Sequence, residues 1–203
     1  MARRETERAA APRQARGRRT REKVVAAAVA CVAEEGFAAA HTNRIAERAG
    51  VTWGVLQYHF GDKDGLLDAV LERGMESVER AFAGLAIEGE DVHERVAAVV
   101  DAGWRVFTSP LALAADEIEI NTRTPRADDP DHAANLLRMN RTLERLALDA
   151  LTKALGKRPS RGVYGAFLAT LRGFALTHLM TRLENDFARE RRALTEMIVE
   201  ASG

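Results

Sequence analysis

The side chains best suited to hydrogen-bonding chemistry stand between residues 42 and 63 of this 203-residue chain. Two short apolar patterns with helical spacing lie there, separated by Gly50, and Thr42 and Thr52 stand where each helix should begin. The apolar residues that can point inward are Ile45, Ala46, Ala49, Val51, Leu56 and Phe60. The residues left on the outer surface are Thr42, Asn43, Arg44, Thr52, Trp53, Gly54, Gln57, Tyr58 and His59.

This outer surface has the chemistry of a nucleic-acid reader. Helix N-termini and threonine hydroxyls suit phosphate oxygens, and the amides of Asn43 and Gln57 can each form a bidentate pair with adenine. Two short helices joined by a glycine turn are typical of a helix-turn-helix, whose second helix enters the major groove of DNA. The pattern therefore predicts a helix-turn-helix with its recognition helix over residues 52–60.

The stretch from about Thr20 to Leu71 resembles the DNA-binding domain of the TetR family. The resemblance is carried by Gly36-Phe37, Thr42 to Ala49 followed by Gly50-Val51-Thr52, Leu56, Tyr58-His59-Phe60, and Lys63 before Leu66-Leu67. It implies an all-α, dimeric protein, usually a repressor, that small ligands release from palindromic operators. The alternative function is that of a ligand-independent DNA-binding protein, or of an activator, with the same fold.

We expect DNA contacts from Thr42, Asn43, Arg44, Thr52, Trp53, Gly54, Val55, Gln57, Tyr58, His59 and Lys63. The resemblance implies that Gln57 faces a base, that Tyr58 and His59 meet the DNA backbone, and that Lys63 meets phosphate. Trp53 stands where the family has a basic or small residue, and Gln57 stands in place of a common tyrosine. Arg44 can instead be a solvated helix charge, and His59 can make a structural hydrogen bond.

The elements that must position these residues are helices throughout, because apolar residues recur at helical spacing and no strand alternation is found. The expected helices cover residues 20–35, 42–49, 52–60, 64–83, 91–109, 111–124, 131–155, 161–184 and 186–201. The predicted fold class is all-α, with a small N-terminal helical unit on a larger bundle. The expected domains are a disordered basic arm (1–19), the helix-turn-helix domain (20–66) and a ligand-binding and dimerisation domain (67–203), with the fourth helix joining head to bundle.

The net charge of zero hides an uneven distribution. Residues 1–23 contain nine Arg or Lys and three Glu, a charge of +6, so the remaining residues sum to −6. A cationic arm suits a polyanion, and ahead of a helix-turn-helix it could lie along the DNA backbone or enter the minor groove. The alternative is a solvated, disordered tail with no partner.

The last two helices suggest a homodimer. Small residues repeat every four positions at Gly165, Ala169, Gly173 and Thr177, which lets another helix approach closely. The final helix offers Phe187, Leu194, Met197 and Ile198 on one side. The resemblance implies that these helices pair across a two-fold axis, whereas the alternative is that both only complete the core of the monomer.

A second group of bulky or soft side chains could line an effector cavity: Trp104, Phe107, Met139, Leu143, Phe174 and His178. Such a cavity would suit a small hydrophobic or aromatic effector. Aromatic and Met residues at helical spacing are, however, more often plain core.

The remaining patterns argue against other classes of protein. Asp128 to His132 combines carboxylates with a histidine, but the chain lacks the Glu-x-x-His motifs on two facing helices that a helical di-metal site needs. It also has no Gly-rich phosphate loop or cysteine cluster, so we expect no enzyme, catalytic residue, metal or cofactor. The single cysteine, Cys31, permits no intrachain disulfide, and we expect it to be a buried apolar residue. The chain shows no membrane span and no signal peptide, which predicts a cytoplasmic protein.

Overall fold

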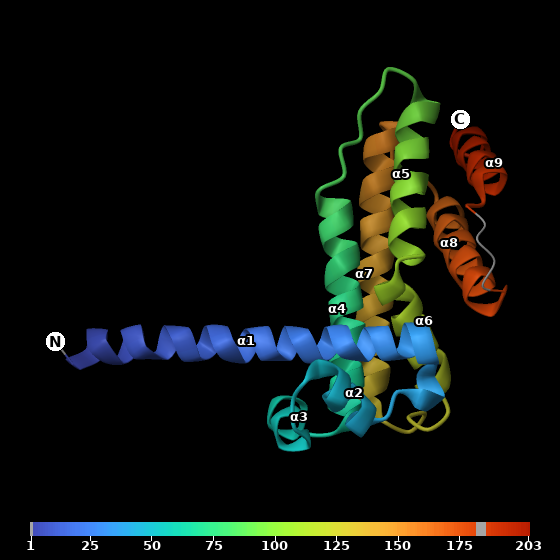
Figure 1. Ribbon diagram of the computed structural model, residues 1–203. Coiled ribbons are helices and arrows are strands. Elements are labelled where there is room, and N and C mark those ends of the chain that lie inside the picture. The colour runs from blue at the N-terminus through green and yellow to red at the C-terminus, as the bar shows by residue number, and fades with distance from the viewer. Residues whose placement is uncertain (1, 182–185) are drawn as a thin grey trace. The chain divides into compact units, whose positions relative to one another are not determined.

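The computed structural model describes residues 2–181 and 186–203, with side chains from residue 14 onwards, and these residues form helices and loops without a strand (Figure 1). The prediction of an all-α fold is therefore confirmed. The elements are α1 (Ala2–Glu35), the 3-10 helix η1 (Phe37–Ala39), α2 (Thr42–Ala49), α3 (Trp53–Phe60), α4 (Lys63–Ala83), α5 (Val92–Phe107), α6 (Pro110–Thr122), α7 (Pro130–Leu155), α8 (Arg161–Thr181) and α9 (Ala188–Glu200).

The chain divides into two compact units, Met1–Glu72 and Arg73–Gly203. The division falls inside α4, six residues later than the domain boundary expected after residue 66. The first half of α4 carries buried Leu66, Leu67, Val70 and Leu71, which belong to the N-terminal unit. One continuous helix thus supplies apolar residues to both units.

The N-terminal unit is built on the buried stripe of α1. Val24, Ala28, Cys31 and Val32 are almost completely buried, and α1 contacts both η1 and α2. The burial of Cys31 agrees with its expected role as a small apolar residue. Burial also raises the pKa of its thiol, which keeps the sulfur protonated and unreactive.

The start of α1 corrects one expectation. We expected a disordered arm over residues 1–19 and a helix from Thr20, but α1 runs as a helix from Ala2. Apolar periodicity detects a helix only where one face packs against the core, and residues 2–19 have no such stripe. Most of these residues are Ala, Arg, Glu or Gln, which are strong helix formers, whereas Pro12 and Gly17 disfavour a helix interior.

Side chains define where most of the later helices begin. The Asp62 carboxylate accepts a hydrogen bond from the Gly65 amide at the start of α4. Asp91, Ser109 and Asp129 accept equivalent bonds at the N-caps of α5, α6 and α7. These short polar side chains replace the partners that the first amides of a helix lack.

The C-terminal unit is a bundle in which α5 contacts α7, α8 and α9. Its core contains residues of all these helices and of α4, including Val99, Phe107, Leu151 and Phe167. Gly103 allows α5 and α8 to approach closely, since a Cβ atom there would lie 2.5 Å from Leu171 Cδ1.

A half-buried carboxylate in this unit gives a testable pH dependence. Burial, reinforced by Glu119 and opposed by Arg172, raises the pKa of Asp116 to about 6. Because the folded pKa exceeds the unfolded one, the folded state binds the proton more tightly, and stability falls as pH rises from about 4 to above 6. Asp116→Asn should remove this fall and raise the unfolding free energy at pH 7.5 by roughly 2 kcal/mol. Parallel denaturant titrations at pH 4.5 and 7.5 measure the difference, and identical pH profiles for both proteins would contradict it.

Candidate nucleic-acid interface

The turn between α2 and α3 has the geometry of a Schellman motif. Gly50 adopts the left-handed conformation (φ 58°, ψ 42°). Its amide bonds to the Glu47 carbonyl at 2.9 Å, and the amide of Val51 bonds to the Ala46 carbonyl at 3.0 Å. Glycine tolerates this backbone conformation without the steric cost that a Cβ atom brings. The turn thus sets the direction in which α3 leaves α2.

The helix α3 has one buried and one exposed face. Leu56 is fully buried and Phe60 is 9% exposed, whereas Tyr58 is 83% and Trp53 is 42% exposed. Gln57 is also exposed. The residues proposed to read DNA therefore stand on the outside of the unit, and the apolar residues of the same helix anchor it to the core.

The N-terminal ends of α2 and α3 have amides available for an acceptor. Thr52 occupies the N-cap of α3 as expected, but its side chain makes no capping hydrogen bond. The expectation for α2 is wrong by one residue, because His41 is the N-cap and Thr42 is the first helical residue. No side-chain capping bond is made at His41 either. First-turn amides without side-chain acceptors are suited to phosphate oxygens.

The C-terminal end of α3 is held by α1 and by a close approach to α4. Arg21 Nη1 donates a hydrogen bond of 2.9 Å to the His59 carbonyl, and its guanidinium lies 4.6 Å from the centre of the Phe60 ring. A cation at a helix C-terminus also compensates the helix dipole. On the other side, Gly65 packs so closely that a Cβ atom there would lie 2.1 Å from the Phe60 carbonyl oxygen. The sequence pattern did not indicate the roles of Arg21 and Gly65, because the Arg21 contact is tertiary and the Gly65 contact depends on how the chain turns between α3 and α4.

The half-buried Lys63 lies at the start of α4, near the end of α3. Its ammonium nitrogen is 4.9 Å from the centre of the Phe37 ring. A cation over an aromatic face is attracted by the ring quadrupole. Phe37 thus positions the charge that sequence analysis assigned to a phosphate contact.

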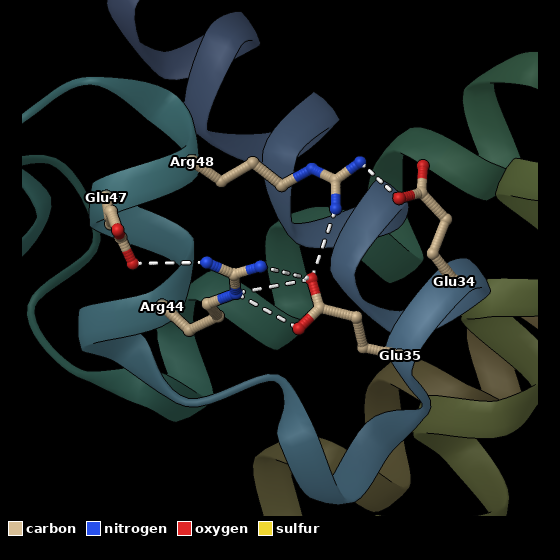
Figure 2. A network of polar contacts seen from close by, with 5 residues as sticks. All are labelled: Glu34, Glu35, Arg44, Glu47 and Arg48. Carbon is tan, nitrogen blue, oxygen red and sulfur yellow. Dashed lines mark hydrogen bonds and ion pairs between the residues drawn. The ribbon is translucent and has the colours of Figure 1, made fainter.

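Arg44 has a different environment from the one we expected. Its guanidinium bonds to both carboxylate oxygens of Glu35, with Nε at 3.0 Å from Oε2, and to Glu47 at 3.2 Å. Arg48 bonds to Glu34 at 2.5 Å and to Glu35 at 3.2 Å, so that five side chains form one network between α1 and α2 (Figure 2). Arg44 therefore tethers α2 to α1, and we omit it from the proposed DNA contacts.

The electrostatics of this network favour its charged form. The hydrogen bond from Arg44 is the main reason that the pKa of Glu35 is lowered, and Glu34 raises the pKa of Arg48. The spacing of Arg44, Glu47 and Arg48 at i, i+3 and i+4 could have indicated a charged helix face. Only the fold brings that face against Glu34 and Glu35.

The aromatic members of the expected effector set gather around α5 and α8. The Trp104 ring lies 5.9 Å from Phe174 and 5.4 Å from Phe187, and Phe174 stacks on Phe187 at 5.0 Å. Arg191 lies 5.7 Å over Trp104 and pairs with Asp101. The other members of the set occupy positions in the same unit: Phe107 and Leu143 are in its core, and Met139 and His178 are half-buried.

The expected dimer residues separate into two groups. Gly165, Ala169, Gly173 and Thr177 form an exposed row on α8, and Met197 on α9 is 63% exposed. The structure corrects the expectation for Leu194 and Ile198, which are 4% and 3% exposed and belong to the core of the unit. Phe187 also packs inward, against Phe174. One side of α9 is therefore used within the protomer, where its apolar residues cover α5.

Comparison with known proteins relates this arrangement to bacterial transcriptional regulators. Residues 24–70 match the model of bacterial regulatory proteins of the tetR family. The HTH-type transcriptional regulator BetI of Stenotrophomonas maltophilia is 30% identical over 127 residues, which cover 57% of this chain and 64% of that protein. The chain is therefore similar to bacterial regulatory proteins of the tetR family. A second relative, BetI 2 of Chromohalobacter salexigens, is 31% identical over 86 residues, or 41% of this chain and 42% of that protein. The chain thus matches less than two thirds of the length of these TetR-family relatives.

Solved structures share this fold over most of the chain. A transcriptional regulator from Rhodococcus sp. Rha1 has a TM-score of 0.67 at 20% identity, and the aligned region covers 90% of this chain and 95% of that protein. FadR from Bacillus subtilis, solved in complex with stearoyl-CoA, has a TM-score of 0.66 at 18% identity. The aligned region covers 89% of this chain and 98% of that protein. At these identities the likeness concerns the fold.

The described part of the chain shows neither a metal cluster nor a single membrane-spanning helix. No group of three or more His, Cys, Asp or Glu among those residues is placed to hold a metal ion. No single described helix is long and apolar enough to cross a membrane, although α5 and α6, which meet at 63°, pass that test when they are taken together.

Proposed function

We propose that this protein is a DNA-binding transcriptional regulator, and specifically a repressor that a small ligand releases from a palindromic operator. The observation that carries the proposal is the exposed outer face of α3, where Trp53, Gln57 and Tyr58 stand opposite the buried anchors Leu56 and Phe60. Such a face fits the major groove, with base contacts near the start of the helix and phosphate contacts around it. Thr42, Asn43, Thr52, His59 and Lys63 supply the further contacts.

The proposed repressor acts as a homodimer through α8 and α9. A row of four small exposed residues on α8 lies near the exposed side chains of Leu176 (45%) and Met180 (75%) on the same helix. Large apolar side chains on a surface mark sites of association when they are contiguous. A two-fold axis through this face presents two copies of α3 to a palindrome, which doubles the number of bases read.

The proposed effector is a small hydrophobic or aromatic molecule bound in the C-terminal unit. Trp104, Phe174 and Phe187 provide aromatic surface there. The buried Nδ1 atom of His178, four residues after Phe174 on α8, has no hydrogen-bond partner among the described residues. An apolar surface with one free polar group suits a ligand that carries one polar group of its own. Because α4 belongs to both units, a ligand that favours one bundle arrangement can change the placement of the reading heads.

Two substitutions on α3 separate base reading from backbone contact. Gln57→Ala should relax preference at one base position of each half-site, by about 10-fold or more, because a bidentate amide pair discriminates by about 1–3 kcal/mol. Tyr58→Phe removes a phosphate hydrogen bond and should weaken binding to every sequence by about 5-fold. Selection of sites from a random duplex library with the wild-type protein supplies the probe, and fluorescence anisotropy gives each affinity. A uniform loss of affinity for Gln57→Ala across all sequences would contradict its role as a base reader.

The alternative is a regulator of the same fold that no ligand releases. Anisotropy of the selected duplex, repeated with a panel of aromatic and acyl compounds, distinguishes the two. A compound that binds the protein and lowers its DNA affinity supports the repressor proposal. If none of the compounds that bind the protein changes its DNA affinity, the ligand-independent alternative holds.

A further inference from the structure

A basic segment of α1 extends beyond the part that packs in the core. In the described side chains of residues 14–23, Arg16, Arg18, Arg19, Arg21 and Lys23 are all exposed. The single acidic residue among them, Glu22, lies 3.7 Å from Arg18. The ion pair is weak because both side chains are largely in water. The exposed segment therefore keeps a strong positive charge.

This segment lies directly beside the C-terminal end of the recognition helix. A Cβ atom at Gly17 would lie 3.8 Å from His59 Cε1, and Arg21 bonds to the His59 carbonyl. The neighbouring Tyr58 ring, 5.1 Å from the His59 ring, is the group that we assign to the DNA backbone. Any duplex that contacts Tyr58 therefore comes close to residues 16–19 of α1.

From Gly17 the chain continues as a helix back to Ala2, past the end of α3 (Figure 1). At 1.5 Å per residue this extension is about 22 Å long, the length of about six base pairs of DNA. Its sequence holds Arg3, Arg4, Arg8 and Arg13 against Glu5 and Glu7. The positive charge is thus distributed along a rod, and a rod reaches a defined stretch of duplex.

The helical state decides which part of the duplex this rod can meet. An α-helix with its side chains is about 10–12 Å in diameter, whereas the minor groove is about 6 Å wide. A flexible arm can thread that groove, but a helix cannot. We propose that residues 2–19 of α1 form a basic helical extension that binds the phosphates flanking each operator half-site, independently of base sequence. The inference rests on the proposed DNA-binding function and adds a second, sequence-independent contact region.

The test uses the full-length protein and a selected duplex with flanks of either 2 or 12 base pairs. The charge variant is Arg16→Gln/Arg18→Gln/Arg19→Gln, and its matched control is Arg105→Gln/Arg158→Gln/Arg161→Gln, at exposed positions of the C-terminal unit. A third variant, Thr20→Pro, keeps every charge but interrupts α1 between the extension and the part of the helix that packs in the core. Circular dichroism checks that each protein is folded, and anisotropy is measured from 50 to 200 mM KCl.

The charge variant should bind the long duplex about 10-fold more weakly than the control at 100 mM KCl. The slope of log affinity against log KCl concentration should be smaller in magnitude by at least about 2, since each lost phosphate contact lowers this slope by about 0.9. Shortening the flanks should weaken the wild type more than the charge variant, which keeps only the arginines at positions 3, 4, 8 and 13 of the extension. Thr20→Pro should behave as the charge variant does.

Several results would overturn the inference. If the charge variant matches its control in affinity and slope while both bind the core site, the extension makes no contact and the proposed function stands. If Thr20→Pro binds like the wild type while the charge variant does not, the arm acts as a flexible chain. A wild-type protein that binds neither duplex would refute the proposed function and this inference together.

Discussion

Replacing Gly65 by alanine is expected to destabilise the N-terminal unit by about 3 kcal/mol and to weaken DNA binding at least 10-fold. A glycine-to-alanine change in a helix normally stabilises it by about 1 kcal/mol, so the expected sign is opposite to the propensity. The reason is steric, because the new Cβ atom would lie 2.1 Å from the Phe60 carbonyl oxygen. That oxygen is backbone at the end of α3, so relief of the clash must displace the recognition helix or α4.

The intrinsic fluorescence of the chain allows this effect to be measured in the correct unit. Its two tryptophans are Trp53 on α3 and Trp104 on α5, so Trp104→Phe leaves a single reporter on the recognition helix. Urea titrations in that background give the unfolding free energy. Gly162→Ala is the control, since a Cβ atom in the first turn of α8 would meet only Ser160 Oγ, at 3.8 Å. Equal stability of Gly65→Ala and the parent protein would show that α3 and α4 do not approach so closely.

The second large effect is expected at the proposed dimer face. Ala169→Glu combined with Gly173→Glu places two carboxylates in the exposed row of α8. Across a two-fold axis these charges would face their own copies without partners, and burial of unpaired charge costs several kcal/mol. We expect a folded monomer whose affinity for a palindromic site is lower by a factor of about 100 or more, because only one half-site can be bound at a time.

Sedimentation velocity and circular dichroism test the two parts of this expectation. Ala134→Glu, at an exposed position of α7, adds a carboxylate elsewhere on the C-terminal unit and should remain dimeric. A wild-type protein that sediments as a monomer at micromolar concentration would contradict the proposed dimer. If instead the control dissociates while the double variant stays dimeric, the subunits meet through α7.

The helix boundaries of the packed elements were largely predictable, because they depend on local signals. The glycine at position 50, the apolar spacing of Leu56 and Phe60 and the prolines at 110 and 130 predict helix ends within two residues of those observed. The extension of α1 was not predicted, because the apolar stripe that identifies a packed helix is missing from residues 2–19. The boundary between the two units was not predicted either. It falls within the continuous helix α4, so no turn or helix end marks it in the sequence.

The sequence alone determined the all-α class, the helix-turn-helix and the outward placement of Gln57 and Tyr58, since periodicity and turn chemistry are properties of neighbouring residues. Only the tertiary structure decided that Arg44 serves the α1–α2 network, that Arg21 holds the end of α3, and that Leu194 and Ile198 are core residues. Each of these outcomes depends on which helices meet and at what distance. An amphipathic pattern shows that a face is buried, but it does not show whether the same chain or a second molecule covers it.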